Sequence, residues 1–122
     1  ISIGLVGSEM CIRDSNLDVE LEDKIGDEEY LKILSESLNK IESSISPEFV
    51  FFISGVDILS TDKLGRLNVS REGCKKRDEI VYEYAYKNSL PIVTSMGGGY
   101  SEKIYDIVEA HCNTFKVMNN LI

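Results

Sequence analysis

The chain has 122 residues, of which 43% are hydrophobic and 28% charged, a length and composition typical of one small globular domain. Acidic residues outnumber basic residues, 21 to 13, and the net charge of −8 argues against nonspecific nucleic-acid binding, which requires a basic surface. No stretch approaches the roughly 20 apolar residues of a membrane span, so we expect neither a nucleic acid nor a membrane as a partner.

The N-terminal segment has no periodic pattern that continues into the following sequence. Residues 5–15, LVGSEMCIRDS, resemble a peptide that recurs in metagenomic gene models in which sequencing-adapter DNA has been translated as protein. On this resemblance we expect residues 1–15 to be a non-native or disordered segment that packs on nothing, and we exclude them from the fold prediction. An ordinary flexible N-terminus is the alternative.

The first predicted helix covers residues 26–45, where apolar residues recur at steps of three and four and form one face. The members of this face are Tyr30, Leu34, Leu38, Ile41 and Ile45. Asp27 is the predicted N-cap, at the positive end of the helix dipole, and Pro47 closes the unit.

Two apolar runs, residues 49–54 and 90–96, predict parallel strands that are buried on both faces. Pro91 lies at the start of the second run, where a missing backbone N–H is tolerated. A helix over residues 71–88, capped by Ser70, separates the two runs. A strand–helix–strand connection of this length predicts parallel pairing with a right-handed crossover, and thus an α/β fold with flanking helices.

The sequence predicts a buried face for each of the two later helices. The inward residues of the helix over 71–88 are Cys74, Val81, Tyr84 and Ala85. Its basic cluster, Lys75, Lys76 and Arg77, is predicted to be solvated. The last helix begins at Ser101, its predicted cap, and ends near Phe115. Its inward residues are Ile104, Ile107, Val108, His111 and Phe115, and the histidine is interpreted as structural.

The three cysteines, Cys11, Cys74 and Cys112, form no CxxC pair and are odd in number. This usage is typical of a reducing compartment rather than of a disulfide framework. We therefore expect a cytoplasmic protein, or a nuclear one in a eukaryote.

Acidic residues and glycines follow the two predicted strands at their carboxyl ends, where parallel α/β sheets bind ligands. Asp57 follows the first strand, and MGGGYS (residues 96–101) follows the second. Asp57 and Asp62 are interpreted either as a metal ligand and its support or as loop carboxylates that accept backbone N–H groups. The glycines let the backbone approach a ligand closely or cradle an anion. Tyr100 either donates its hydroxyl to an oxyanion or packs at the helix entry.

Several of these stretches together resemble a known family. GDEEYL, SGVDILSTDKLGRLNVSREG, PIVTSMGGGYS and EAHCNTF are similar to the C-terminal part of the histone deacetylase superfamily, and most to its class IV branch and bacterial relatives. The resemblance covers about residues 17–115 and implies a partial arginase/deacetylase fold with an incomplete sheet. Residues 16–122 are then expected to be the C-terminal part of a deacetylase catalytic domain.

The resemblance also implies roles for individual residues. Asp57, in the GVD motif, corresponds to a ligand of the catalytic zinc. Tyr100, in GGGY, corresponds to the tyrosine whose hydroxyl donates to the scissile amide oxygen. Gly98 and Gly99 would lie at the floor of the acetyl-lysine tunnel, and Asp62 would have a supporting role. The implied cofactor is Zn²⁺, and the implied substrate is an acetylated lysine side chain or a small acetylamine.

The family takes its other two zinc ligands from an Asp-x-His motif, and its acid/base pair from adjacent histidines, both upstream. This chain contains one histidine and neither motif. We therefore expect a fragment of a zinc-dependent deacetylase that is inactive as given and does not bind zinc tightly. A small non-enzymatic α/β module that binds an ion or a ligand is the alternative.

Overall fold

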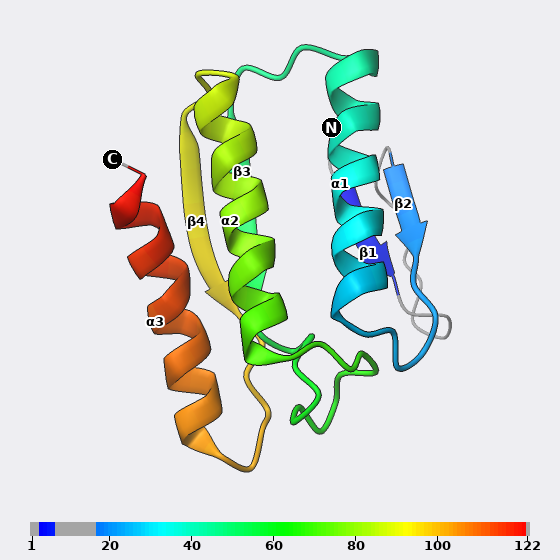
Figure 1. Cartoon of the computed structure of the whole chain (residues 1–122), viewed down its shortest axis with the longest axis vertical. Coiled ribbons are helices and arrows are strands. Elements are labelled where there is room, and N and C mark those ends of the chain that lie inside the picture. Colours follow the sequence, from blue (N-terminus) through cyan, green and yellow to red (C-terminus); the bar gives the residue numbers. More distant parts are fainter. Residues whose placement is uncertain (1–2, 7–16, 122) are drawn as a thin grey trace.

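The computed structural model of the chain describes residues 3–6 and 17–121. Its elements are β1 (Ile3–Val6), β2 (Leu17–Glu20), α1 (Asp27–Ser44), β3 (Val50–Gly55), α2 (Arg71–Lys87), β4 (Ile92–Gly97) and α3 (Ile104–Asn120). Helix α2 packs between α1 and α3 and lies over β3 and β4, whereas β1 and β2 lie beside α1 (Figure 1). None of the helices in these ranges is long and apolar enough to cross a membrane.

Strands β3 and β4 form a parallel pair joined by α2. Val50 lies opposite Ile92 at one end of the pair, and Gly55 lies opposite Gly97 at the other. This arrangement confirms the predicted strand–helix–strand unit with parallel pairing. Because the strands are parallel, the loops that follow Gly55 and Gly97 leave the same edge of the sheet.

Within the described part of the chain, one face of the β3–β4 pair is covered and the other is open. On the covered face the rings of Phe52 and of Tyr82 of α2 pack nearly perpendicular to each other, with 5.8 Å between their centroids. On the other face Phe51 and Ile53 are 79% and 73% exposed, and Val93 is exposed as well. The prediction that both strands are buried on both faces is therefore wrong for the described part of the chain. Helix α2 covers one side, and no described element packs on the other.

The first turns of α1 and α2 are joined by a carboxylate. Ser70 caps α2 as predicted, since its hydroxyl oxygen accepts a hydrogen bond from the backbone N–H of Gly73 at 3.0 Å. The N-cap of α1 is Gly26, so the prediction that Asp27 has this role is wrong. Asp27 is the first residue of the helix, and its carboxylate accepts hydrogen bonds from the backbone N–H and the hydroxyl of Ser70.

Helix α3 is longer than predicted and presents a different face. It begins after Lys103 without a side-chain cap and continues to Asn120, so the prediction that Ser101 caps it is wrong. Its buried residues are Ala110, Thr114 and Val117. Among the predicted inward residues, Ile104, Val108 and Phe115 are instead exposed. The helix meets α2 through small and polar side chains, a pattern that a search for large apolar residues misses.

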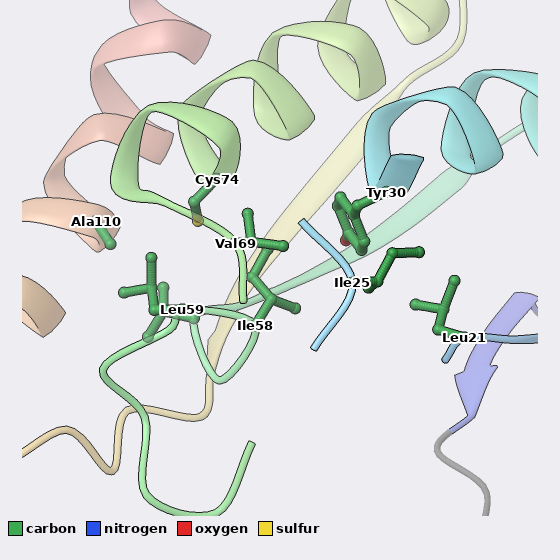
Figure 2. Packing of buried hydrophobic residues seen from close by; sticks show 9 residues of the cluster. Leu21, Ile25, Tyr30, Ile58, Leu59, Val69, Cys74 and Ala110 are labelled. Carbon is green, nitrogen blue, oxygen red and sulfur yellow. The ribbon is translucent and has the colours of Figure 1, made fainter. Parts of the chain in front are cut away.

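The hydrophobic core is centred on the loop between β3 and α2. Val56, Leu59 and Val69 of this loop are at most 2% exposed. Figure 2 shows Leu59 and Val69 lying toward Cys74 of α2, while Tyr30 of α1 packs from the opposite side. The loop is therefore held rigidly by the core, and the residues that follow Gly55 start from a fixed position.

Strands β1 and β2 form a separate two-stranded parallel sheet, with Ile3 opposite Leu17 and Val6 opposite Glu20. Residues 3–6 thus pair with the domain, contrary to the expectation that residues 1–15 pack on nothing. Residues 1–2 and 7–15 lie outside the described residues. An apolar stretch of any origin can pair with an open sheet edge, so the non-native assignment of this segment stays a prediction.

Candidate functional site

The structure brings Asp57 and the glycine loop together at the carboxyl edge of the β3–β4 pair. The backbone N–H of Val56 donates to the carbonyl of Gly97 at 3.0 Å, which extends the ladder one step beyond β3. A Cβ atom added to Gly98 would lie 2.9 Å from the Cβ atom of Asp57. Asp57 and the glycine loop are therefore in direct contact, and the Asp57 side chain is exposed at this edge.

The two glycines of this loop are both required by the geometry. Gly98 and Gly99 have φ angles of +67° and +107°, in the region that favours glycine. A Cβ atom on Gly99 would approach the Ile107 side chain of α3 to 3.0 Å, so a larger residue here would also push against the helix. These contacts explain the glycines structurally, and their place at the floor of a substrate tunnel stays a prediction.

Asp62 ties the two loops to each other. One carboxylate oxygen, Oδ1, accepts hydrogen bonds from the backbone N–H groups of Leu64 and Gly65 at 2.9 and 2.8 Å. The other, Oδ2, accepts from the backbone N–H of Tyr100 at 2.8 Å. Asp62 is thus a loop carboxylate that accepts hydrogen bonds from backbone N–H groups, which was one of the two interpretations of the sequence. It fixes the backbone that carries Tyr100, whose side chain is 57% exposed.

Behind the carboxyl end of β3 lies a buried ion pair that the sequence reasoning missed. Arg77 is 4% exposed and Asp78 is fully buried, so the prediction that Arg77 belongs to a solvated face is wrong. Arg77 donates to Asp78 Oδ1 through Nε at 2.9 Å and Nη2 at 2.7 Å. Burial lowers the pKa of Arg77, but the neighbouring Cys74 and Asp78 raise it by more. The net shift of the pKa is upward, and the guanidinium remains charged.

The helical period itself could have identified this pair. Cys74, Arg77, Asp78 and Val81 follow one another at steps of three, one and three, which places them all on the inward side of α2. The prediction of a solvated face rests on the charge of Arg77 and not on its position along the helix. An arginine beside an aspartate on an otherwise inward face can be buried as a paired charge.

The single histidine is a half-buried residue of α3. Burial of His111, followed by the nearby charge of Arg77, lowers the pKa of its imidazole. Its Nδ1 atom is buried and has no hydrogen-bond partner among the described residues. The lowered pKa favours the neutral imidazole, but the unpaired Nδ1 atom does not fit the prediction of a structural histidine whose hydrogen bonds are satisfied.

The donors in the described ranges do not complete a metal site. No group of three His, Cys, Asp or Glu side chains there could hold a metal ion. A catalytic zinc takes three protein ligands, and Asp57 is the one carboxylate that the sequence reasoning assigned to it. A cavity of about 360 Å³ lies between β2 and α1, and none of the predicted site residues lines it.

Comparison with protein families gives one match that covers most of the chain. The family described as the histone deacetylase domain matches residues 6–115. An uncharacterized protein of Picosynechococcus sp. is 34% identical over 97 residues, which make up 80% of this chain and 32% of that protein. Histone deacetylase 2 of Arabidopsis thaliana is 40% identical over 73 residues, 60% of this chain and 19% of that protein. The chain spans about a third or less of the length of these relatives.

Solved structures agree with this match. The chain resembles an HDAC homolog from Aquifex aeolicus with a TM-score of 0.71 and 25% identity, over 84% of this chain and 26% of that one. It resembles an acetylpolyamine aminohydrolase from Burkholderia pseudomallei with a TM-score of 0.69 and 18% identity, over 87% of this chain and 28% of that one. The predicted partial arginase/deacetylase fold is confirmed.

Proposed function

Because the chain belongs to the histone deacetylase family, we propose that it is part of a zinc-dependent deacetylase that hydrolyses acetyl-lysine or a related acetylamine. The observation that supports this proposal best is the contact between Asp57 and Gly98, with Asp62 holding the backbone of Tyr100. A metal-binding carboxylate and a hydroxyl donor would thus belong to adjoining loops at one edge of the sheet. A cytoplasmic location, or a nuclear one in a eukaryote, stays a prediction.

Each residue of this edge has a proposed role. Asp57 would be one zinc ligand, and the Tyr100 hydroxyl would donate a hydrogen bond to the oxyanion that forms on the acetyl group. One such donor typically lowers a barrier by ~3–4 kcal/mol. Gly98 and Gly99 would let the substrate approach the backbone closely, because a side chain at either position would occupy that space.

Zinc dependence is proposed for a longer protein and not for this chain by itself. The one carboxylate that we assign to zinc does not compete with water for the ion, and the chain has no pair of histidines to accept a proton. We therefore expect the isolated chain neither to bind zinc at micromolar concentration nor to deacetylate. The alternative of a self-standing ion-binding module predicts the opposite result for zinc.

The first test is zinc titration of the purified chain by calorimetry, with turnover of a fluorogenic acetyl-lysine peptide measured in parallel. Asp57→Ala is compared with Asp23→Ala, and Tyr100→Phe with Tyr86→Phe, since both control side chains are exposed and lie outside the site. Stoichiometric micromolar zinc binding that disappears only in Asp57→Ala would favour the binding module and contradict our proposal for the isolated chain.

The second test extends the source DNA upstream of the codon for Asn16. The proposal expects a reading frame that encodes an Asp-x-His motif and adjacent histidines, followed by this chain. In that longer protein Asp57→Ala should abolish zinc binding, and Tyr100→Phe should lower kcat by about 100-fold or more with zinc still bound. An upstream frame without these motifs, or full activity of Tyr100→Phe, would refute the proposed roles.

A further inference from the structure

One buried arginine binds the last carbonyl of β3. The Nη1 group of Arg77, from the middle of α2, donates a hydrogen bond to the carbonyl oxygen of Gly55. Gly55 is the final residue of β3 and stands two positions before Asp57. The remaining guanidinium nitrogens donate to Asp78, so the fork of Arg77 joins a helix side chain to the end of a strand.

The partner of this arginine is itself held from a third element. Asp78 accepts from Arg77 through Oδ1, and its other oxygen, Oδ2, accepts from the hydroxyl of Thr114 of α3 at 2.7 Å. Both Asp78 and Thr114 are fully buried. The orientation of the Arg77 fork is therefore set by two helices, and the Phe52 ring, 5.5 Å from its central carbon, packs on the fork.

The peptide unit between Gly55 and Val56 is bound on both sides. Its carbonyl accepts from Arg77, and its N–H, which belongs to Val56, donates to the Gly97 carbonyl of β4 at 3.0 Å. With both polar groups paired, this peptide plane cannot rotate without loss of a buried hydrogen bond. The direction in which the chain continues to Asp57 follows from the orientation of this plane.

Stability alone does not account for a charged network at this place. A buried ion pair is often no more stabilising than apolar side chains of the same volume, because both charges lose their hydration. What a guanidinium adds is a rigid, planar fork with donors in fixed directions. Here one arm of the fork is directed at the carbonyl that precedes the candidate ligand.

We propose that Arg77 is a positioning residue, oriented by Asp78 and Thr114, which fixes the Gly55–Val56 peptide and thereby the place of Asp57. The statement that Asp57 is placed for a metal rests on the proposed function. The anchoring of the peptide does not, and it can be measured with no metal and no substrate present.

The test is amide hydrogen exchange of the whole chain, followed by NMR. In Arg77→Met we expect the Val56 amide to exchange about tenfold faster or more, relative to amides in α1, because its neighbouring carbonyl has lost a charge-assisted bond. Arg77→Lys should fall between Arg77→Met and the parent, since an ammonium group cannot reproduce the fork. The matched control is Val81→Ala, which removes buried volume one turn along α2 but leaves every hydrogen-bonding group of the network in place.

Comparison at equal global stability separates positioning from general support. Urea is added to the more stable samples until all variants have the same free energy of unfolding. Faster exchange confined to Val56 and its neighbours in the Arg77 variants would support the proposal. Equal change at Val56 and in α1, as expected for Val81→Ala, would overturn it.

A milder variant keeps the test decisive if Arg77→Met does not fold. Thr114→Val has nearly the same volume. It removes the hydroxyl that donates to Asp78 Oδ2 and, with it, the longer contact of the same hydroxyl with the Ala110 carbonyl of α3. It should raise the exchange rate of the Val56 amide by a smaller factor, about threefold. If neither this variant nor Arg77→Lys changed the exchange rate at Val56, the proposal would be refuted. Failure of the proposed deacetylase function would appear in the upstream sequence and in zinc binding, and it would leave these exchange rates unaffected.

Discussion

Removal of the Asp62 carboxylate should loosen the loop that carries Tyr100. Asp62 accepts hydrogen bonds from three backbone N–H groups, those of Leu64 and Gly65 in its own loop and that of Tyr100. At this partly exposed position we take about 1 kcal/mol for each bond. This value is below the roughly 1.5–3 kcal/mol of hydrogen bonds to charged groups because water screens the carboxylate, so Asp62→Ala should lower the free energy of unfolding by about 3 kcal/mol. Asp62→Asn keeps one acceptor oxygen for its own loop, but its amide would face the Tyr100 N–H as a second donor. Its cost should be about 1–2 kcal/mol.

The assay is urea denaturation together with hydrogen exchange at the Tyr100 amide. Both Asp62 variants should exchange faster at Tyr100, and the asparagine variant separates the bond to Tyr100 from the bonds within the loop. Glu102→Gln is the matched control. Glu102 lies beside the same loop, but its carboxylate makes only an exposed ion pair with Lys63 at 2.8 Å, so this change should cost less than about 0.5 kcal/mol.

The reasoning would be refuted by one specific result. If Asp62→Asn left the exchange rate of the Tyr100 amide at the parent value while its overall stability fell, the carboxylate would support only its own loop. A Glu102→Gln variant as destabilised as Asp62→Ala would also refute it, because the effect would then come from loss of negative charge and not from the backbone bonds.

Three further predictions use other parts of the molecule. Burial lowers the pKa of His111 in the folded chain, so the unfolded chain binds more protons and stability should fall as the pH drops below 6.5. The urea midpoint of His111→Gln should therefore vary less with pH than that of the parent chain. The same pH dependence in both proteins would contradict this prediction. Burial raises the pKa of the Cys74 thiol to about 11. Of the two cysteines in the described residues, iodoacetamide at pH 8 should therefore modify exposed Cys112 before Cys74, and Cys74 only on unfolding, which peptide mass spectrometry can follow. Phe51→Ser with Ile53→Ser should reduce self-association in light scattering and lower stability by less than about 1 kcal/mol, since both side chains are largely exposed; unchanged association would count against the open face as its cause.

The elements of the fold could be predicted from apolar periodicity, but their coverage could not. The steps of three and four in α1, the two apolar runs and the Ser70 cap all appear in the structure close to their predicted places. An apolar run shows that a strand belongs in a core, but it does not show whether the same chain supplies both covering layers. Phe51 and Ile53 are therefore exposed here although their residue types favour burial.

The predicted site followed from topology more than from residue type. Parallel strands in sequence order were enough to place Asp57 and the glycine loop at one edge. The role of Arg77 could not be predicted from hydrophobicity, because a hydrophobicity pattern places a charged residue in solvent unless its partner is known. That partner, Asp78, is adjacent in sequence, but Thr114, which completes its hydrogen bonds, is 36 residues further on.

The bond from Tyr100 to Asp62 closes a segment of 38 residues, and this length has a consequence for the order of folding. Closing a flexible segment of that size costs about 3 kcal/mol of chain entropy or more, which exceeds the contribution of a single hydrogen bond. Pairing of β3 with β4, over six residue pairs, brings the two loops within reach beforehand. The Asp62–Tyr100 bond therefore forms after the strands have paired, so substitutions of Asp62 should speed unfolding and leave the folding rate almost unchanged.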